Sequence, residues 1–186
     1  MLKVLRAAIC VALALPIAMN NVTGSEAATY VFDNRHADVN FSYYVGFLAQ
    51  SGHFTEIDGL LQFDEYNPER GSVDAVIKTA SLTANAWEAE LKGSGFFNVA
   101  VFPEIRFKSR SVTPAGANRA DFIGDLTMNG VTQPITLQAI LINARHITAK
   151  AHIKRSDFNM TALSLLVADE IDIQIEAELI EKARER

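Results

Sequence analysis

The chain has 186 residues, of which 17 are basic and 22 are acidic, so its formal net charge is −5. Nucleic-acid-binding proteins usually carry clustered positive charge, and this mildly acidic composition argues against that class. The length fits one domain, and no linker, repeat or low-complexity segment divides it.

The N-terminus has the features of a secretory signal peptide. Lys3 and Arg6 precede an apolar run over residues 7–18, which is shorter than the roughly 20 residues of a membrane-spanning helix. Small residues follow this run, and we predict cleavage after Ala27, with Ala28 as the alternative position. An uncleaved N-terminal membrane anchor is the competing interpretation.

Cleavage would remove the single cysteine, Cys10, which lies inside the apolar run. The mature chain would then have no disulfide, no thiolate chemistry and no cysteine-based zinc site. The loss of two basic residues and one acidic residue would bring its net charge to −6. We therefore expect residues 1–27 to be a cleaved signal peptide and residues 28–186 to form one small exported domain.

Most of the mature chain alternates between apolar and polar residues. This period of two predicts strands with one buried face, and the charged opposite face favours an antiparallel sheet over a parallel one. Turn-forming residues separate most of these strands. About eight such strands predict a sandwich or an up-and-down barrel. The clearest alternating segments are residues 37–43, 72–78, 104–112, 122–128, 134–141, 146–154 and 170–179.

Residues 81–103 interrupt the alternation. Ala84, Trp87 and Leu91 have helical spacing, Glu88 and Lys92 form an i,i+4 pair, and a glycine follows. A dense aromatic segment that includes Phe96 and Phe97 comes next. We expect a short helix and an aromatic loop across one end of the barrel.

The segment GDLTMNG, residues 124–130, raises the question of what the inner face contacts. Phe122, Leu126 and Met128 share one face of the predicted strand because alternate side chains point the same way. An eight-stranded barrel can be filled by its own side chains or can hold one ligand. The residues alone leave both readings open.

Catalytic and metal-binding patterns are weak in this sequence. The four histidines, His36, His53, His146 and His152, form no HxxxH or HxH pair, and no GxSxG motif occurs. We expect His146 and His152 on the outer surface and His36 as a turn partner of Asp33. We predict neither a catalytic residue nor a bound metal.

Five segments follow one another in a distinctive order: YVFDNRHADVNFSY, GHFTEIDGLLQFD, GFFNVAVFPEIRFKS, IGDLTMNGVTQPITL and IKRSDFNM. The double Phe before the Pro and Phe-Lys-Ser strand is the most specific, together with the Gly-Asp-Leu-Thr hairpin. In these segments the chain resembles the YceI-like family, and the resemblance extends from Tyr30 to Leu179.

The resemblance implies an extended, antiparallel, eight-stranded β-barrel similar to lipocalins, exported to the bacterial periplasm. It also implies a tubular apolar cavity for an isoprenoid or another long-chain lipid, and it carries over no catalytic residue. We therefore expect residues 28–186 to form one lipid-binding β-barrel domain, with the short helix and the aromatic loop near one end. The candidate lining residues are Phe41, Tyr43, Trp87, Phe96, Phe97, Phe107, Phe122, Leu126, Met128, Leu137 and Ile173.

The sequence departs from the family pattern at three places, one of which is a chain between Leu137 and Ile153 that is shorter than usual, as expected for a trimmed hairpin. The family commonly has Arg-Asp-x-His-Leu in the helical segment, whereas residues 87–91 read Trp-Glu-Ala-Glu-Leu. An early-strand Lys-His pair of the family is replaced by Tyr44 and Val45. These replacements remove polar side chains that could contact a lipid head group, so the sequence does not identify that head group.

These expectations describe a non-catalytic periplasmic carrier or reservoir for an isoprenoid or similar long-chain amphiphile. It would need no cofactor beyond the bound lipid, and it would not bind nucleic acid. Transient membrane contact and a homodimer are both compatible with this role. Two alternatives stay open: an accessory to a quinone-linked enzyme or electron-transfer system, and an envelope-stress protein with a solid core.

Overall fold

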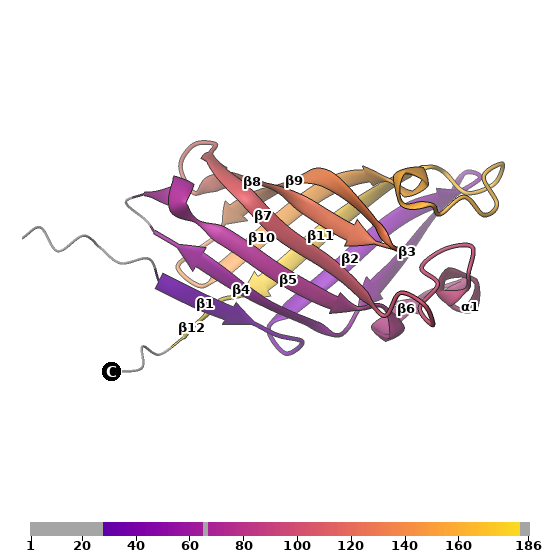
Figure 1. The fold of residues 1–186 in the computed structure, drawn as a ribbon, viewed down its shortest axis with the longest axis horizontal. Coiled ribbons are helices and arrows are strands. Elements are labelled where there is room, and N and C mark those ends of the chain that lie inside the picture. Colours follow the sequence, from indigo (N-terminus) through magenta and orange to yellow (C-terminus); the bar gives the residue numbers. More distant parts are fainter. Residues whose placement is uncertain (1–27, 65–66, 183–186) are drawn as a thin grey trace, which may run out of the picture.

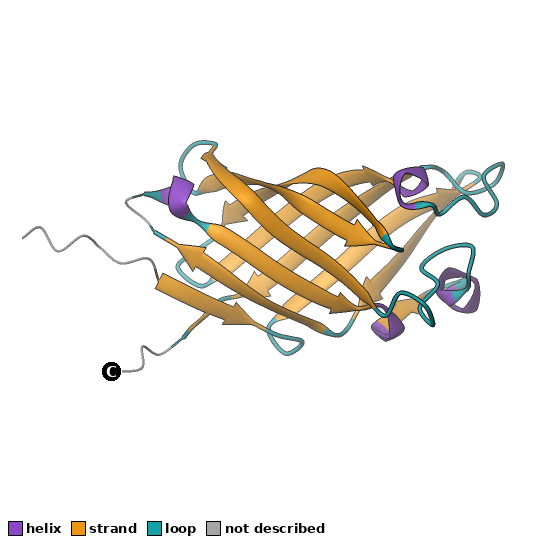
Figure 2. Cartoon of the chain, viewed as in Figure 1, coloured by secondary structure: helices purple, strands orange, loops and turns teal. Residues whose placement is uncertain are grey.

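A computed structural model of the chain describes residues 28–64 and 67–182, and it is nearly all β (Figures 1 and 2). The predicted signal peptide and the alternative membrane anchor lie outside these residues. The helix α1 spans Glu88–Lys92. The strands are β1 (Ala28–Phe32), β2 (Ala37–Val45), β3 (Leu48–Phe54), β4 (Ile57–Phe63), β5 (Ser72–Lys78), β6 (Leu82–Ala84), β7 (Glu104–Pro114), β8 (Arg119–Met128), β9 (Val131–Leu141), β10 (His146–Lys154), β11 (Glu170–Glu178) and β12 (Ile180–Glu181).

The strands form one antiparallel sheet that curls back on itself (Figure 1). Its order is β12-β1-β4-β5-β7-β8-β9-β10-β11-β2-β3-β6. In this order β11 lies eight positions from β12, yet only Leu179 separates these two strands along the chain. Because β12 pairs with β1 while β11 pairs with β10 and β2, the sheet has to curve round to satisfy both sets of partners. The predicted all-β, antiparallel, lipocalin-like fold is confirmed.

The number of strands differs from the predicted eight, since the sheet of the described residues has twelve. Two of the strands that the alternation did not predict contain a glycine on the inner face. Gly52 of β3 lies opposite Phe41, and Gly59 of β4 lies opposite Phe32. The aromatic ring occupies the space that a side chain at the glycine would need. An inward position without a side chain breaks the apolar alternation, although the strand still pairs.

The predicted helix is shorter than its spacing suggested. Ala84 belongs to β6, and Trp87 precedes α1 in a left-handed conformation with φ of 64°. The expected pair between Glu88 and Lys92 is present at 2.7 Å, and the chain leaves the helix at Gly93. In Figure 1, α1 lies at one end of the barrel beside β6.

The outer face of the sheet carries the polar half of the alternation. In β2, Val39, Phe41 and Tyr43 are buried, while the residues between them are exposed. On the neighbouring β10 and β11, His152 lies between two acidic side chains. Its Nδ1 is 2.8 Å from Asp172, and its Nε2 is 2.5 Å from Glu170. Hydrogen bonds to Asp172 and then Glu170 raise the pKa of His152 above its ordinary value of 6.5.

We expect a titration of His152 followed by NMR to give a pKa above 6.5, and the Asp172→Asn variant to lower it. A raised pKa in the folded state means that the ion pair stabilises the protein below pH 6.5 and that this contribution is lost as the pH rises through the folded-state pKa. The pair is exposed, so the change in stability is expected to be small. Asp74→Asn, on a distant strand, serves as the control. A His152 pKa at or below 6.5 in the wild type would contradict the arrangement.

Candidate ligand-binding cavity

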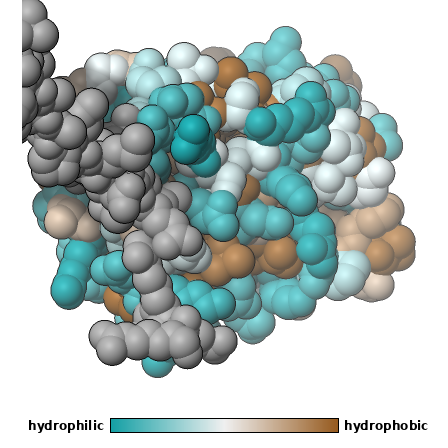
Figure 3. Space-filling model, turned by 60° about the vertical axis from the view of Figure 1, so that its left-hand side comes forward, coloured by the Kyte–Doolittle hydropathy of each residue, from teal (hydrophilic) through white to brown (hydrophobic). Residues whose placement is uncertain are grey.

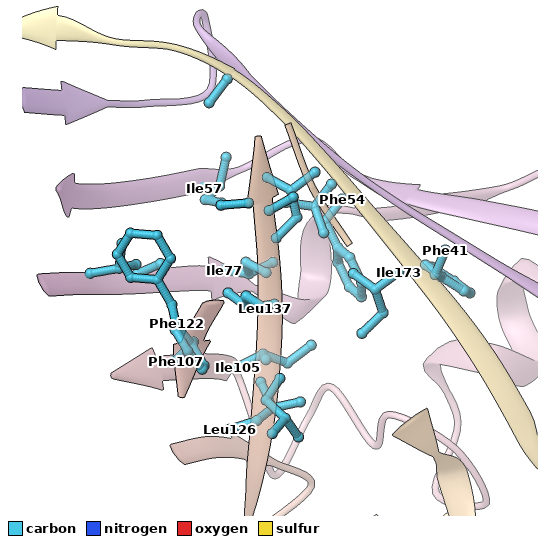
Figure 4. A pocket seen from close by; sticks show the side chains of 18 of the residues that line it. Phe41, Phe54, Ile57, Ile77, Ile105, Phe107, Phe122, Leu126, Leu137 and Ile173 are labelled. Carbon is cyan, nitrogen blue, oxygen red and sulfur yellow. The ribbon is translucent and has the colours of Figure 1, made fainter. Parts of the chain in front are cut away.

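An apolar cavity lies inside the curled sheet (Figure 4). Its volume is about 120 Å³, and every described residue that lines it is apolar. Strands β1 to β5 and β7 to β11 all contribute side chains, because the inner face of each strand points to the same enclosed space. Figure 4 shows side chains such as Ile77, Leu137 and Ile173 extending into this space from different strands.

The accessibility of the inner face indicates that this interior is hollow. Ile173 and Ile175 of β11 point into the cavity, yet both are only half-buried. Val73 and Ile77 of β5 behave in the same way. Inward-facing side chains in a close-packed core would be fully buried. The sheet therefore encloses space that its own side chains do not fill.

The segment around Gly124 forms part of the cavity wall. Phe122, Leu126 and Met128 of β8 are buried and line the cavity, as the alternation predicts. Gly124 lies between them, where the backbone of β7 and the ring of Phe107 approach too closely for a side chain. The large side chains of this strand thus face an enclosed space, and the glycine lets the neighbouring strand come close.

Aromatic rings close the cavity at the end near α1. The ring centroids of Phe41, Phe54 and Phe97 lie 5.4–5.7 Å from one another. Phe97 comes from the loop after α1, whereas the other two rings come from β2 and β3. The predicted aromatic loop therefore supplies a ring to the closed end of the cavity.

The predicted lining residues divide into two groups. Tyr43, Trp87 and Phe96 lie in a smaller pocket on the outer side of the aromatic rings, with a volume of about 20 Å³. The other eight line the main cavity: Phe41, Phe97, Phe107, Phe122, Leu126, Met128, Leu137 and Ile173. That any of these residues contacts a ligand remains a prediction.

Tyr43 carries an unusual polar group in this smaller pocket. The residue is only 4% exposed, and its hydroxyl has no hydrogen-bond partner within residues 28–64 and 67–182. Desolvation by burial raises the pKa of this phenol. A pocket of about 20 Å³ has room for one water-sized group. Tyr43 therefore presents a free hydrogen-bonding group beside the closed end of the cavity.

The opposite end of the barrel opens into a wider mouth of about 460 Å³. Leu61, Phe122 and Leu179 line both the mouth and the apolar cavity, so the two spaces adjoin each other. Figure 3, turned toward this end, shows hydrophobic surface between hydrophilic residues. Unlike the cavity, the mouth also has polar lining residues, which are Tyr30, Asp64, Asn118 and Arg119.

The sequence did not reveal this mouth. Its residues come from the ends of several strands and from loop residues such as Asp64, Asn118 and Ala144, which meet only when the sheet curls. The alternation also missed Phe54 and Ile57, which line the cavity from β3 and β4. Those strands carry the glycines that disturb the pattern, and the available signal was the apolar pair Leu60 and Leu61.

The cavity provides hydrophobic contact and no acid, base or nucleophile from the residues that line it. Within the described part of the chain, no group of three or more His, Cys, Asp or Glu side chains could hold a metal ion. His36 contacts Asp33 at 2.8 Å, as predicted for a turn, and His53 contacts the hydroxyl of Thr83. None of the helices in residues 28–64 and 67–182 is long and apolar enough to cross a membrane.

Comparison with known proteins assigns this architecture to a family. Residues 30–179 match the YceI-like domain. The chain belongs to the YceI-like family. Curated relatives from Salmonella arizonae and Salmonella paratyphi B, both called Protein YceI, are 36% identical over 175 residues, which cover 86% of this chain and 91% of theirs.

Solved structures agree with the family assignment. BcnA from Burkholderia cenocepacia is similar with a TM-score of 0.72 and 25% identity, covering 80% of this chain and 98% of that protein. A polyisoprenoid-binding domain from Saccharophagus degradans has the same fold with a TM-score of 0.57 and 14% identity, covering 85% of this chain and 99% of that domain. The predicted resemblance to the YceI-like family is confirmed.

We expect Tyr43→Phe to leave the ligand-free protein as stable as the wild type or to stabilise it by about 1 kcal/mol, because it removes a buried hydroxyl that lacks a partner. Urea unfolding of the delipidated proteins measures this change. Tyr44→Phe, at an exposed position on the same strand, is the matched control. Destabilisation by more than about 1 kcal/mol would mean that the Tyr43 hydroxyl does have a partner.

Proposed function

We propose that this YceI-like protein is a non-catalytic periplasmic carrier or reservoir for an isoprenoid or similar long-chain amphiphile. The observation that carries the proposal is the apolar cavity, which has no polar residue among its described lining residues and adjoins a partly polar mouth. A hydrocarbon tail fits the cavity because it needs no hydrogen bond there. The polar head group would lie at the mouth, where Asn118 and Arg119 offer polar contacts.

The size of the cavity favours a slender tail. A volume of about 120 Å³ is comparable to the roughly 150 Å³ cavity that holds one benzene molecule in a well-studied protein. At this volume the cavity has room for only a short part of a long chain, and the rest of the chain would extend toward the adjoining mouth. Flexible side chains such as Met128 can adjust to an irregular apolar ligand. A broad, rigid ring system would require the strands to separate.

The energy of transfer fits a carrier. Moving a tail of about 20 carbons from water into an apolar site releases roughly 16 kcal/mol, at about 0.8 kcal/mol per methylene. A tail taken from a membrane is already out of water, so this term nearly cancels. Packing and head-group contacts then decide the affinity. Such a balance allows the protein both to load the lipid and to release it.

Two further observations support the proposal. A polyisoprenoid-binding domain shares this fold, which makes the same class of ligand a reasonable choice for the cavity. The predicted signal peptide over residues 1–27 supports a periplasmic location. The open interior argues against the solid-core alternative. The accessory role in a quinone-linked system would need a polar group facing the main cavity, and the described lining residues supply none.

Leu126→Trp tests whether the space is used. The added ring should obstruct the cavity, so the variant is expected to lose most of the lipid that co-purifies with the wild type. Its thermal midpoint should change little, because a hollow interior can accept the larger side chain. In a solid core the same change would overpack and destabilise by roughly 1–3 kcal/mol. Lipid extraction with mass spectrometry and a thermal melt provide the two measurements.

The matched control is Ile123→Trp, on the outer face of the same strand. This variant should keep both its lipid and its thermal midpoint. If neither the wild type nor the control carries a lipid, and Leu126→Trp unfolds at a much lower temperature, the carrier function is wrong.

Export has its own test. Mature protein recovered from the periplasm is expected to begin at Ala28 or Thr29 when its N-terminus is sequenced, because the leader ends in small residues. Intact Met1 in a membrane fraction would instead support the N-terminal anchor.

A further inference from the structure

Two loops lie side by side at the α1 end of the barrel: the turn between β2 and β3, and the segment that precedes β11 (Figure 1). The amide of Gly46 donates a hydrogen bond to the carbonyl of Leu166 at 2.8 Å. The amide of Ala168 donates to the carbonyl of Tyr44 at the same distance. An isolated antiparallel bridge joins Val45 and Val167 between these bonds. The backbone thus fixes the two loops to each other.

The two loops and Trp87 carry a group of exposed apolar side chains, which we name the apolar tip. Phe47 and Leu165 are essentially fully exposed at 101% and 99%. Trp87 belongs to the same surface because it shares the small pocket with Leu163 and Leu166. Soluble monomers rarely expose contiguous apolar patches larger than a few hundred Å², and larger ones usually mark an interaction site. The apolar tip consists of Tyr44, Phe47, Leu48, Trp87, Leu163, Leu165 and Leu166.

The exposure of these side chains is a built feature of the fold. The buried side chain of Arg155 holds the loop before β11 by donating hydrogen bonds to its carbonyls. Leu163 has a left-handed φ of 52°, a conformation that is costly for leucine, and its carbonyl accepts a bond from the amide of Leu166 at 2.8 Å. The carbonyls bound by Arg155 are those of Met160, Ala162, Val167 and Ala168. The loop is therefore held in the shape that displays its leucines.

Charge is absent from both loops. No Asp, Glu, Lys or Arg occurs between Val39 and Gly52 or between Phe158 and Ala168. The outer faces of the barrel strands, by contrast, carry charged residues at alternate positions. Tyr44 and Trp87 have amphipathic rings, the type that collects where a membrane meets water. Glu88 and Glu90 of the nearby α1 would oppose contact with an anionic surface.

We propose that the apolar tip docks the protein onto the surface of a lipid bilayer, without a requirement for anionic lipids. Single side chains that project fully from tight turns gain little burial against a flat protein surface. A bilayer can instead enclose them, since apolar groups at an interface penetrate by roughly 5–10 Å. The absence of charge on the tip suits a zwitterionic membrane.

This inference rests on the proposed carrier function for its purpose. The small pocket lies directly beneath the tip, because Leu163, Leu166 and Trp87 line it together with Tyr43 and Phe96. On the inner side, Tyr43 stacks on Phe41 with ring centroids 6.0 Å apart, and Phe41 belongs to the rings that close the cavity. Docking would bring the closed end of the barrel next to the bilayer and would leave the mouth, at the opposite end, facing away from it.

Flotation with neutral phosphatidylcholine–phosphatidylethanolamine vesicles tests the docking. The Phe47→Ser/Leu165→Ser double variant should bind about tenfold or more weakly than the wild type, because it removes the two most exposed apolar side chains. The control is Ile123→Ser/Ile142→Ser, which removes two exposed aliphatic residues away from the tip. The control should float as the wild type does, and added salt should change wild-type binding little.

Several outcomes would overturn the proposal: no flotation of the wild type, equal flotation of the tip variant, or binding that needs anionic lipid and disappears with salt. A wild-type dimer that the tip variant converts to a monomer would assign the tip to self-association instead. Loading with lipid supplied in detergent, without vesicles, separates the docking proposal from the carrier function. A tip variant that loads this lipid but takes none from vesicles supports docking. If neither the wild type nor the variants load this lipid, while the wild type still floats with vesicles and the tip variant does not, only the carrier function is rejected.

Discussion

The interior of this protein depends on one geometric constraint, the placement of consecutive strands β11 and β12 at distant positions of the same sheet. Leu179 alone connects them, so the sheet has to curl until β12 reaches β1. In a curled antiparallel sheet, the inner half of every alternating strand faces one shared space. The apolar residues of ten strands thus meet in a cavity. The polar half faces water, where pairs such as His152 with Asp172 form.

The two ends of the cavity differ in chemistry, and this difference favours one orientation of a bound amphiphile. At one end Phe97 packs edge to face on Phe41 and Phe54, and the three rings close the space. At the other end the loops leave a mouth with polar and apolar walls. An amphiphile can satisfy its tail and its head group in only one orientation along such an axis. The apolar tip lies on the outer surface at the closed end. The apolar patch of the surface and the closed, apolar end of the cavity therefore lie at the same end of the barrel.

Glycines shape this interior as much as the large side chains do. Gly52 and Gly59 leave gaps that the rings of Phe41 and Phe32 occupy from the neighbouring strands. In each case the ring from the neighbouring strand covers the glycine and keeps the cavity wall continuous. The strand that holds the glycine loses an apolar residue from its alternation. This is why β3 and β4, and the cavity residues Phe54 and Ile57, could not be predicted from the pattern. A pattern along one strand contains no information about a ring that arrives from another.

The sequence by itself determined the antiparallel β class, the inner face of most strands and the family. These follow from side-chain periodicity and local motifs, which act within a few residues, and eight of eleven predicted lining residues accordingly face the main cavity. Only the tertiary structure decided the twelve-strand sheet, the mouth at Arg119 and the placement of Tyr43, Trp87 and Phe96 outside the aromatic closure. Each of these depends on which distant segments meet when the sheet curls. Contacts between distant segments produce no periodic pattern in the sequence.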